Sequence, residues 1–146
     1  MPRVFTYSFE DTAVNINHPG FENYSAYGTG IGSLTVAFST DNSSHQIAAD
    51  KTVVVSKVTV HDGTVTLSVL QNSDFHKWLK RWADFLENSA TSQFALSTLD
   101  ISNKSTGAFY HCVGVTHQKK PNEDFQSQAQ TVSWTLMCAD ISTVNN

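Results

Sequence analysis

One change of hydrophobic period, near residue 73, constrains the fold of this chain more than any other feature. Before it, residues 64–70 alternate, with Val65, Leu67 and Val69 on one face, as in a half-buried strand. After it, residues 73–88 carry large apolar side chains at helical spacing on one stripe: Phe75, Trp78, Leu79, Trp82, Phe85 and Leu86. A helix this apolar must lie against a sheet. The pattern therefore predicts a β-rich body with one amphipathic helix.

Alternating or β-branched segments on both sides of the helix predict the strands of this body. They are residues 4–9, 12–17, 33–39, 52–60, 64–70, 94–102, 108–117 and 131–143. Asp62-Gly63 is a pair typical of tight turns, so the segments on either side of it, 52–60 and 64–70, are expected to form a hairpin. Residues 21–32 are expected to be a loop. Residues 40–51 are expected to be either a long loop or the tip of a long hairpin.

The order of strands, one helix and strands favours a mainly β (α+β) fold, an antiparallel β-sandwich or barrel with the helix on it. The length of 146 residues fits a single domain over residues 1–146. Thirteen acidic residues against nine Lys and Arg give a net charge of −4, which argues against a nucleic-acid binder because no basic surface is available. No apolar leader opens the chain, so we expect a soluble protein that is made in a cytoplasm.

The motifs that could carry chemistry are better explained by structure. Residues 28–32 (GTGIG) are glycine-rich, but a strand follows them rather than the helix that phosphate binding requires. His111 and His117 are expected on one strand face without the third ligand that zinc needs, so no metal is expected. Cys112 must point away from its neighbour His111, and it is expected to pack in the core, as is Cys138. We therefore expect neither an enzyme nor a cofactor.

The order of these segments resembles a known family. Tyr7-Ser8-Phe9-Glu10-Asp11 leads into a strand, residues 47–50 (IAAD) precede a β-branched strand, and residues 63–73 run straight into the helix. Ser105-Thr106-Gly107, a strand with a cysteine and a last strand with Trp134 follow. This arrangement is similar to the tail tube proteins of contractile-tailed bacteriophages over nearly the whole chain, most strongly over residues 62–88. The family often has Gly-Ala-Asp-Gly where this chain has residues 48–51 (AADK).

The resemblance implies a structural virion protein that forms stacked hexameric rings, a tail tube through which DNA is ejected. Its partners would be further copies of itself and the sheath, baseplate and terminator proteins, with double-stranded DNA passing through without specific binding and without membrane insertion. The protein would be assembled in the host cytoplasm and reside in the virion tail. Ring closure would satisfy strand edges that a monomer leaves open.

Three sets of residues are assigned to surfaces on this basis. The expected lumen-facing set is hydroxyl-rich and comprises Lys57, Thr59, Thr64, Thr66 and Ser68. The expected ring-stacking loop comprises Asp41, Asn42, Ser43, Ser44, His45 and Gln46, within the polar segment 40–51. The expected outer face of the helix comprises Lys77, Lys80 and Arg81. The alternative function is another assembly or binding module on a similar sandwich: a secretion-system tube protein, a baseplate or tail-completion protein, or a carbohydrate-binding domain.

Overall fold

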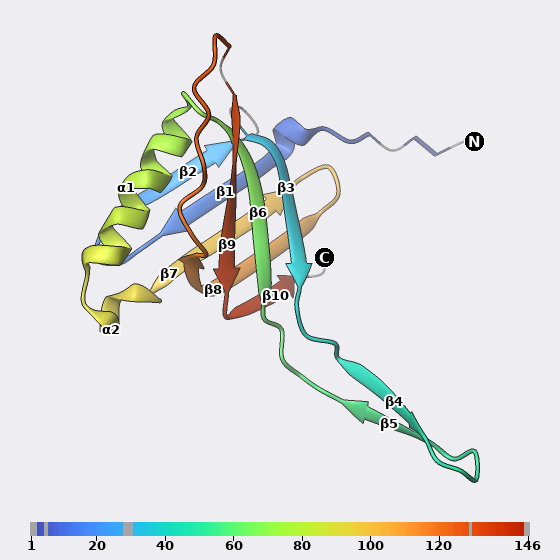
Figure 1. Cartoon of the computed structure of the whole chain (residues 1–146). Coiled ribbons are helices and arrows are strands. Elements are labelled where there is room, and N and C mark those ends of the chain that lie inside the picture. The colour runs from blue at the N-terminus through green and yellow to red at the C-terminus, as the bar shows by residue number, and fades with distance from the viewer. Residues whose placement is uncertain (1–2, 5, 28–30, 129, 145–146) are drawn as a thin grey trace.

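The computed structural model of the chain describes residues 3–4, 6–27, 31–128 and 130–144 (Figure 1). The strands that these residues form are β1 (Thr12–Asn17), β2 (Asn23–Tyr27), β3 (Ile31–Phe38), β4 (Ser43–Ile47), β5 (Val53–Lys57), β6 (Gly63–Leu70), β7 (Ser97–Asn103), β8 (Ala108–His117), β9 (Thr131–Cys138) and β10 (Asp140–Val144). The helical segments are a short 3-10 helix (Phe9–Asp11), α1 (Asp74–Asn88) and α2 (Thr91–Phe94).

The strands of the body pair in the order β2-β1-β7-β8-β9-β6-β3, with β10 added to β8, and every pairing is antiparallel. The sheet folds over between β8 and β9, where only Thr116 and His117 of β8 pair with β9. This bend gives two layers, with β9, β6 and β3 in front of the other strands in Figure 1. The predicted antiparallel sandwich with one main helix is confirmed.

The core lies between the two layers and under α1. Val65, Leu67 and Val69 point inward from β6 and are fully buried, as their alternation predicts. The apolar stripe of α1 closes one end of the core, with Trp78 and Trp82 among its buried side chains. The side chain of Ser73 caps the helix by accepting a hydrogen bond of 3.2 Å from the backbone N–H of His76. The prediction of a helix over residues 73–88 is thus confirmed within one residue.

The predicted hairpin around Asp62-Gly63 is wrong. Strand β6 pairs with β3 and β9, whereas β5 pairs with β4. A Cβ atom on Gly63 would lie 2.2 Å from the carbonyl oxygen of Ala37, so this glycine permits the close approach of β6 to β3. The side chain of Thr40 donates to Asp62 Oδ1 at 2.5 Å, which fixes Asp62 at the start of β6 rather than in a tight turn.

Several predicted boundaries also differ from the structure. Residues 6–8 form no strand, and Ser8 instead caps the 3-10 helix that follows, while residue 5 lies outside the described residues. Strand β2 occupies part of the predicted loop 21–32, because pairing with β1 overrides its polar sequence; residues 28–30 lie outside the described part. Residues 131–143 form two strands, β9 and β10, because the chain turns at Ala139.

A β-bulge at Gly114 changes the histidine arrangement expected for β8. Gly114 has φ of +65°, and the register of β8 against β7 shifts between residues 113 and 115. The extra residue inverts the alternation, so that His117 points into the core while His111 lies half-exposed on the outer face. The prediction that His111 and His117 share one face is therefore wrong.

Candidate assembly surfaces

A two-stranded arm, residues 41–60, projects away from the body (Figure 1). At its tip, the backbone N–H of Ala48 donates to the carbonyl of Thr52 at 2.9 Å, and Lys51 adopts φ of 68°. The backbone N–H of Thr52 also donates to the carboxylate of Asp50 at 3.0 Å, and this bond lowers the pKa of Asp50. The tip is a defined turn, which confirms the hairpin alternative for residues 40–51.

The base of the arm is held together by one side chain. Asn42 Nδ2 donates to the carbonyl oxygens of Val58 and Val60, at 3.0 and 3.1 Å. The backbone N–H of Val58 returns a bond of 2.8 Å to the carbonyl of Asn42. These bonds satisfy backbone groups beyond the ends of β4 and β5, so the two chains of the arm stay paired where they leave the body.

The two faces of the arm differ in polarity. Residues directly opposite each other in an antiparallel pair share a face. Ile47 is opposite Val53, His45 is opposite Val55 and Ser43 is opposite Lys57, so these three pairs make one face, which is apolar toward the tip. The next pairs, Gln46 with Val54 and Ser44 with Ser56, make the other face. We call the first, defined by Ile47, Val53 and Val55, the apolar face of the arm, and the second its polar face.

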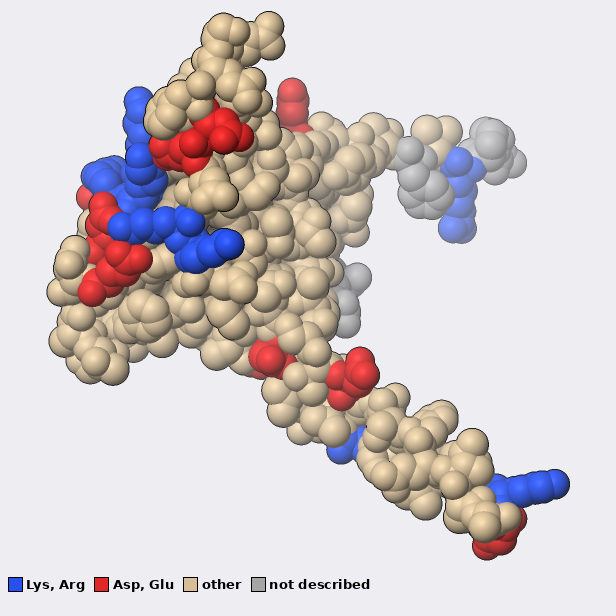
Figure 2. All heavy atoms as spheres, viewed as in Figure 1, with Lys and Arg blue, Asp and Glu red and all other residues tan. Residues whose placement is uncertain are grey.

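A second surface is the outer face of β3, β6 and β9, which is coated with hydroxyl groups. The strand registers place Ser33, Ser68 and Ser133 side by side in one row. Thr35, Thr66 and Thr135 form the next row, and Thr64 lies in the row after that. The surface in front of these strands is free of Lys, Arg, Asp and Glu at its centre in Figure 2. We call this surface the hydroxyl face.

The expected lumen-facing residues do not all lie together. Thr64, Thr66 and Ser68 are on the hydroxyl face, whereas Lys57 ends β5 in the arm and Thr59 follows it. The expectation that Lys57 and Thr59 lie beside β6 depended on the hairpin that the structure corrects. Ser33 and Ser133 share the hydroxyl face but were missed. The alternation of polar and apolar residues in the sequence indicates that both serines face outward, but only the strand pairing places them beside Ser68.

Charged side chains gather around the outer face of α1 in the view of Figure 2. Lys77, Lys80 and Arg81 are exposed there, at the positions that the helical period predicts. Arg81 contacts the Glu22 carboxylate at 3.4 Å. The Lys120 ammonium, from the segment between β8 and β9, contacts the carboxylates of both Asp84 and Glu87. These two bonds, the one with Asp84 more than the one with Glu87, raise the pKa of Lys120.

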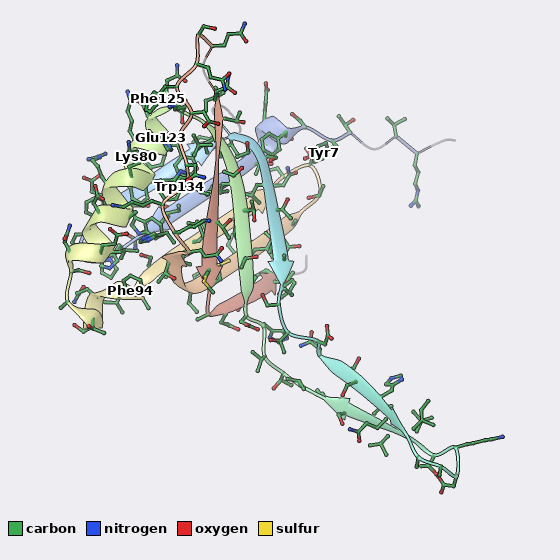
Figure 3. All side chains as sticks on the ribbon, viewed as in Figure 1. Tyr7, Lys80, Phe94, Glu123, Phe125 and Trp134 are labelled. Atoms are coloured by element: carbon green, nitrogen blue, oxygen red, sulfur yellow. The ribbon has the colours of Figure 1, made fainter. Side chains whose placement is uncertain are left out.

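The segment 118–128 is held against the body at Glu123, which lies near Lys80 in Figure 3 and is bonded to the buried His76. Trp134 Nε1–H donates to His76 Nδ1 at 3.0 Å, so this nitrogen must be unprotonated. His76 Nε2–H then donates to the Glu123 carboxylate at 2.6 Å, which Lys80 also contacts at 3.1 Å. The bonds from His76 and Lys80 lower the pKa of Glu123. Beyond this clamp, Phe125 is 85% exposed at the segment's outer part.

A third surface is a groove of about 290 Å³ at the open side of the sandwich, under the edge strand β3. Its apolar lining comes from four separate parts of the chain: Tyr7, Phe9, Leu34, Val36, Ile101 and Tyr110. No charged side chain is among the described residues that line it. We call it the seam groove. No local pattern predicts this groove, because its lining residues come together only through the sheet topology.

The other residues that could have carried chemistry, the cysteines and histidines, have structural positions instead. Cys112 and Cys138 are free, buried thiols, and the hydrogen bond between them together with burial raises the pKa of Cys112. Cys112 and His111 point to opposite faces, as expected for adjacent strand residues. Within the described part of the chain, no cluster of three metal-ligating side chains occurs, and no helix is long and apolar enough to span a membrane.

Comparison with known proteins then decides the family. The family model described as Bacteriophage PhiTE tail tube protein matches residues 4–145. The chain belongs to this family. Members of the PhiTE tail tube family are structural tail components and not enzymes, in agreement with the prediction from sequence. A search of curated proteins found no match.

Solved structures with the same fold come from contractile injection systems. The tube-terminating cap of the anti-feeding prophage aligns with a TM-score of 0.59 and 11% identity, over 100% of this chain and 95% of that one. The sheath/tube terminator of the extracellular contractile injection system PVC aligns with a TM-score of 0.60 and 9% identity, over 97% and 99%. The PVC sheath–tube complex gives 0.58 and 10%, over 96% and 92%. At this identity the likeness shows that this chain shares their fold.

Proposed function

We propose that this tail tube protein forms stacked hexameric rings whose bore conducts DNA during ejection. The observation that carries the proposal is the arm, which projects from a member of a tube family with its apolar side chains uncovered: Ile47 is 76% exposed and Val55 is 61% exposed. A chain that functioned as a monomer would gain nothing from leaving such side chains in water. In the proposed tube, neighbouring copies of the chain would bury these side chains, which its own body leaves exposed.

Ring closure would use the ends of the sheet. The strand order ends at β2 and at β3, and each has one side without a paired strand in the described part of the chain. An unpaired edge exposes backbone N–H and C=O groups that a neighbouring copy can bond. Contacts between unlike edges are heterologous, and such contacts close into rings when the rotation between neighbours divides a full turn.

The hydroxyl face is our candidate for the wall of the bore. Among the expected lumen-facing residues it includes Thr64, Thr66 and Ser68, and the register adds Ser33 and Ser133. Hydroxyl groups without positive charge offer the DNA phosphates no ion pairs, so a duplex can slide past without being held. The outer face of α1, with Lys77, Lys80 and Arg81, would then look away from the bore.

That outer position makes α1 the candidate contact for a sheath. The PVC structure with the same fold is a sheath–tube complex, which supports a sheath as partner here. Baseplate and terminator proteins would contact the two ends of the tube, and assembly would take place in the host cytoplasm. Ring stacking would use the arm, including the expected residues Asp41, Asn42, Ser43, Ser44, His45 and Gln46.

Negative-stain microscopy of the purified protein at rising concentration tests this proposal. We expect rings with six-fold symmetry, and tubes at higher concentration. A terminator would instead cap tube ends without polymerising, and a carbohydrate-binding module would remain a discrete particle that binds glycans. Either result, or a protein that stays monomeric at every concentration, would overturn the proposed function.

A further inference from the structure

We propose that Cys112 and Cys138 form a disulfide within one chain when the protein meets an oxidising environment, and that this bond locks the corner between the two layers of the sandwich. The oxidant is a peroxide, a molecule small enough to reach a nearly closed site. The inference goes beyond the proposed tube function, since both thiols belong to one chain and the bond needs no neighbouring copy.

The corner between β8 and β9 brings the two cysteines together. Cys138 is the last residue of β9, in the front layer of Figure 1, and Cys112 lies in β8, in the layer behind it. The backbone N–H of Ala139 donates to the carbonyl of Val113 at 3.0 Å, so the residues just before these two lie on either side of one short contact. Both cysteine side chains are buried in the same core, with 0% of Cys112 and 4% of Cys138 exposed. The two thiols thus meet across the corner, where a hydrogen bond joins them.

The bulge at Gly114 permits this approach. A Cβ atom on Gly114 would lie 2.7 Å from the Cβ atom of Ala139, so a residue with a side chain would push β8 away from the turn. The extra residue also lets Cys112 and Val115, which are three positions apart, both point into the core. The bulge therefore holds β8 against the turn that follows Cys138.

Strand pairing joins the two layers through few residues at this corner. In the described part of the chain, Thr116 and His117 are the two residues of β8 that pair with β9, whereas β6 pairs with β9 along eight residue pairs. The chain between the cysteines includes the largely exposed segment 118–128. A disulfide that closes this loop removes much of the freedom of the unfolded chain. It would thus stabilise the fold at the point where the layers share the shortest pairing.

Cys138 is the thiol that the oxidant attacks first. It is the less deeply buried of the two, and the hydrogen bond from Cys112 lowers the pKa of Cys138, so its thiolate forms more readily. The thiolate attacks one oxygen of hydrogen peroxide and breaks the O–O bond, which leaves a sulfenic acid on Cys138 and releases water. Cys112 then attacks that sulfur, loses its proton and expels the hydroxyl group as a second water molecule. Two thiols supply the two electrons that one peroxide takes.

The timing of the bond follows from the two environments of a virion protein. The chain has two cysteines in total, so a bond within the chain has one possible pairing. A cytoplasm keeps thiols reduced, whereas oxidants reach proteins outside the cell. In a virion tail, the function proposed above, the chain would fold and assemble as the dithiol and gain the disulfide after release.

Oxidation of the purified full-length chain tests the proposal. After treatment with a small excess of hydrogen peroxide, the unfolded wild type should take up no maleimide, and mass spectrometry should find the peptides of Cys112 and Cys138 linked within one chain. The melting temperature should rise by about 10 °C, as expected for a disulfide that closes a loop of this length. Dithiothreitol should return it to its starting value.

Cys112→Ala and Cys138→Ala are the matched controls, because each keeps one thiol and cannot form the bond. Each variant is compared with its own untreated sample, so the cost of the core substitution cancels. Neither should gain melting temperature on treatment. The same comparison accounts for peroxide acting elsewhere, for example on Met137, which is 47% exposed.

Three results would overturn the inference: thiols that still take up maleimide after treatment, oxygen added to either cysteine without a bond, or a disulfide between separate chains alone. A bond that forms without raising the melting temperature would overturn the locking role. All of these leave the tube function standing, because the test needs no tubes. If the wild type forms no tubes under any condition, the proposed function fails, and the oxidation result stands by itself.

Discussion

Strands β5 and β6 are both rich in valine, yet they lie in opposite environments. The inward side chains of β6 are fully buried between the two layers, whereas Val53, Val54 and Val55 of β5 are at least half exposed. β-Branched residues favour an extended backbone in both cases. What differs is the number of neighbours: β6 lies between β3 and β9, and β5 has only β4. The body thus has its own buried core, whereas β5 has no layer packed on its exposed valines.

The largest expected effect is a loss of stability from a substitution in the core of the body, with little effect from one in the arm. Leu67→Ala should lower the free energy of unfolding of the monomer by about 2–5 kcal/mol, because it opens a cavity in the core. Ile47→Ala, in the arm, should change it by less than about 0.5 kcal/mol, because that side chain is already in water. Urea denaturation of both variants measures the difference. Equal losses would mean that the arm packs on its own body in solution.

A smaller effect tests which strands are neighbours. Gly63→Ala should cost about 1–3 kcal/mol, because the added methyl group would lie 2.2 Å from the carbonyl oxygen of Ala37. Gly32→Ala is the control: its added methyl group would meet Ser68 at 3.4 Å, an ordinary contact. Thermal denaturation of the two variants compares them. If Gly63→Ala left the stability unchanged, β6 would not approach β3 this closely, and the tight hairpin between residues 52–60 and 64–70 would be favoured again.

The smallest expected effect concerns the segment 118–128, which is bonded to the body through Glu123. Hydrogen bonds from His76 and Lys80 keep the pKa of Glu123 below its ordinary value. The stabilisation is therefore present above the unfolded-state pKa of about 4.3 and is lost as pH falls through the lower folded-state value. Glu123→Gln should lower the melting temperature slightly at pH 7, as expected for partly exposed ion pairs of about 1 kcal/mol or less.

The pH profile is the check on that prediction. The gap in melting temperature between the wild type and Glu123→Gln should shrink as pH falls below about 4. Lys77→Gln serves as a control on the same helix, because Lys77 is exposed there without joining Glu123. A gap that stays constant from pH 7 to pH 3 would show that the ionised carboxylate does not hold the segment.

Features that depend on the hydrophobic period of neighbouring residues were predictable from the sequence. Features that depend on which strands pair were not. The helical stripe of α1 and the alternation of β6 depend only on nearby residues, so both were predicted correctly. The partner of β5 depends on the close approach of Gly63 to Ala37, which no local pattern contains. Because of the same error, Lys57 and Thr59 lie in the arm and not beside β6, where the sequence had placed them.

Two further features needed the three-dimensional structure. The bulge at Gly114 inverts the alternation of β8, and a lone glycine within a strand pattern was its only sign in the sequence. The seam groove joins Tyr7, Leu34 and Tyr110, which are far apart in the chain. Such a surface follows from the sheet topology, which no local pattern in the sequence contains.

Hydrogen exchange of the arm tests the central claim most directly. Amide protons of β4 and β5 should exchange within seconds to minutes in the monomer, because an isolated hairpin opens readily, while those of β6 stay protected. In assembled tubes the arm should become protected by about tenfold or more, with β6 unchanged. An arm as protected as β6 in the monomer, or one that gains no protection in tubes, would contradict the account that a second copy covers it.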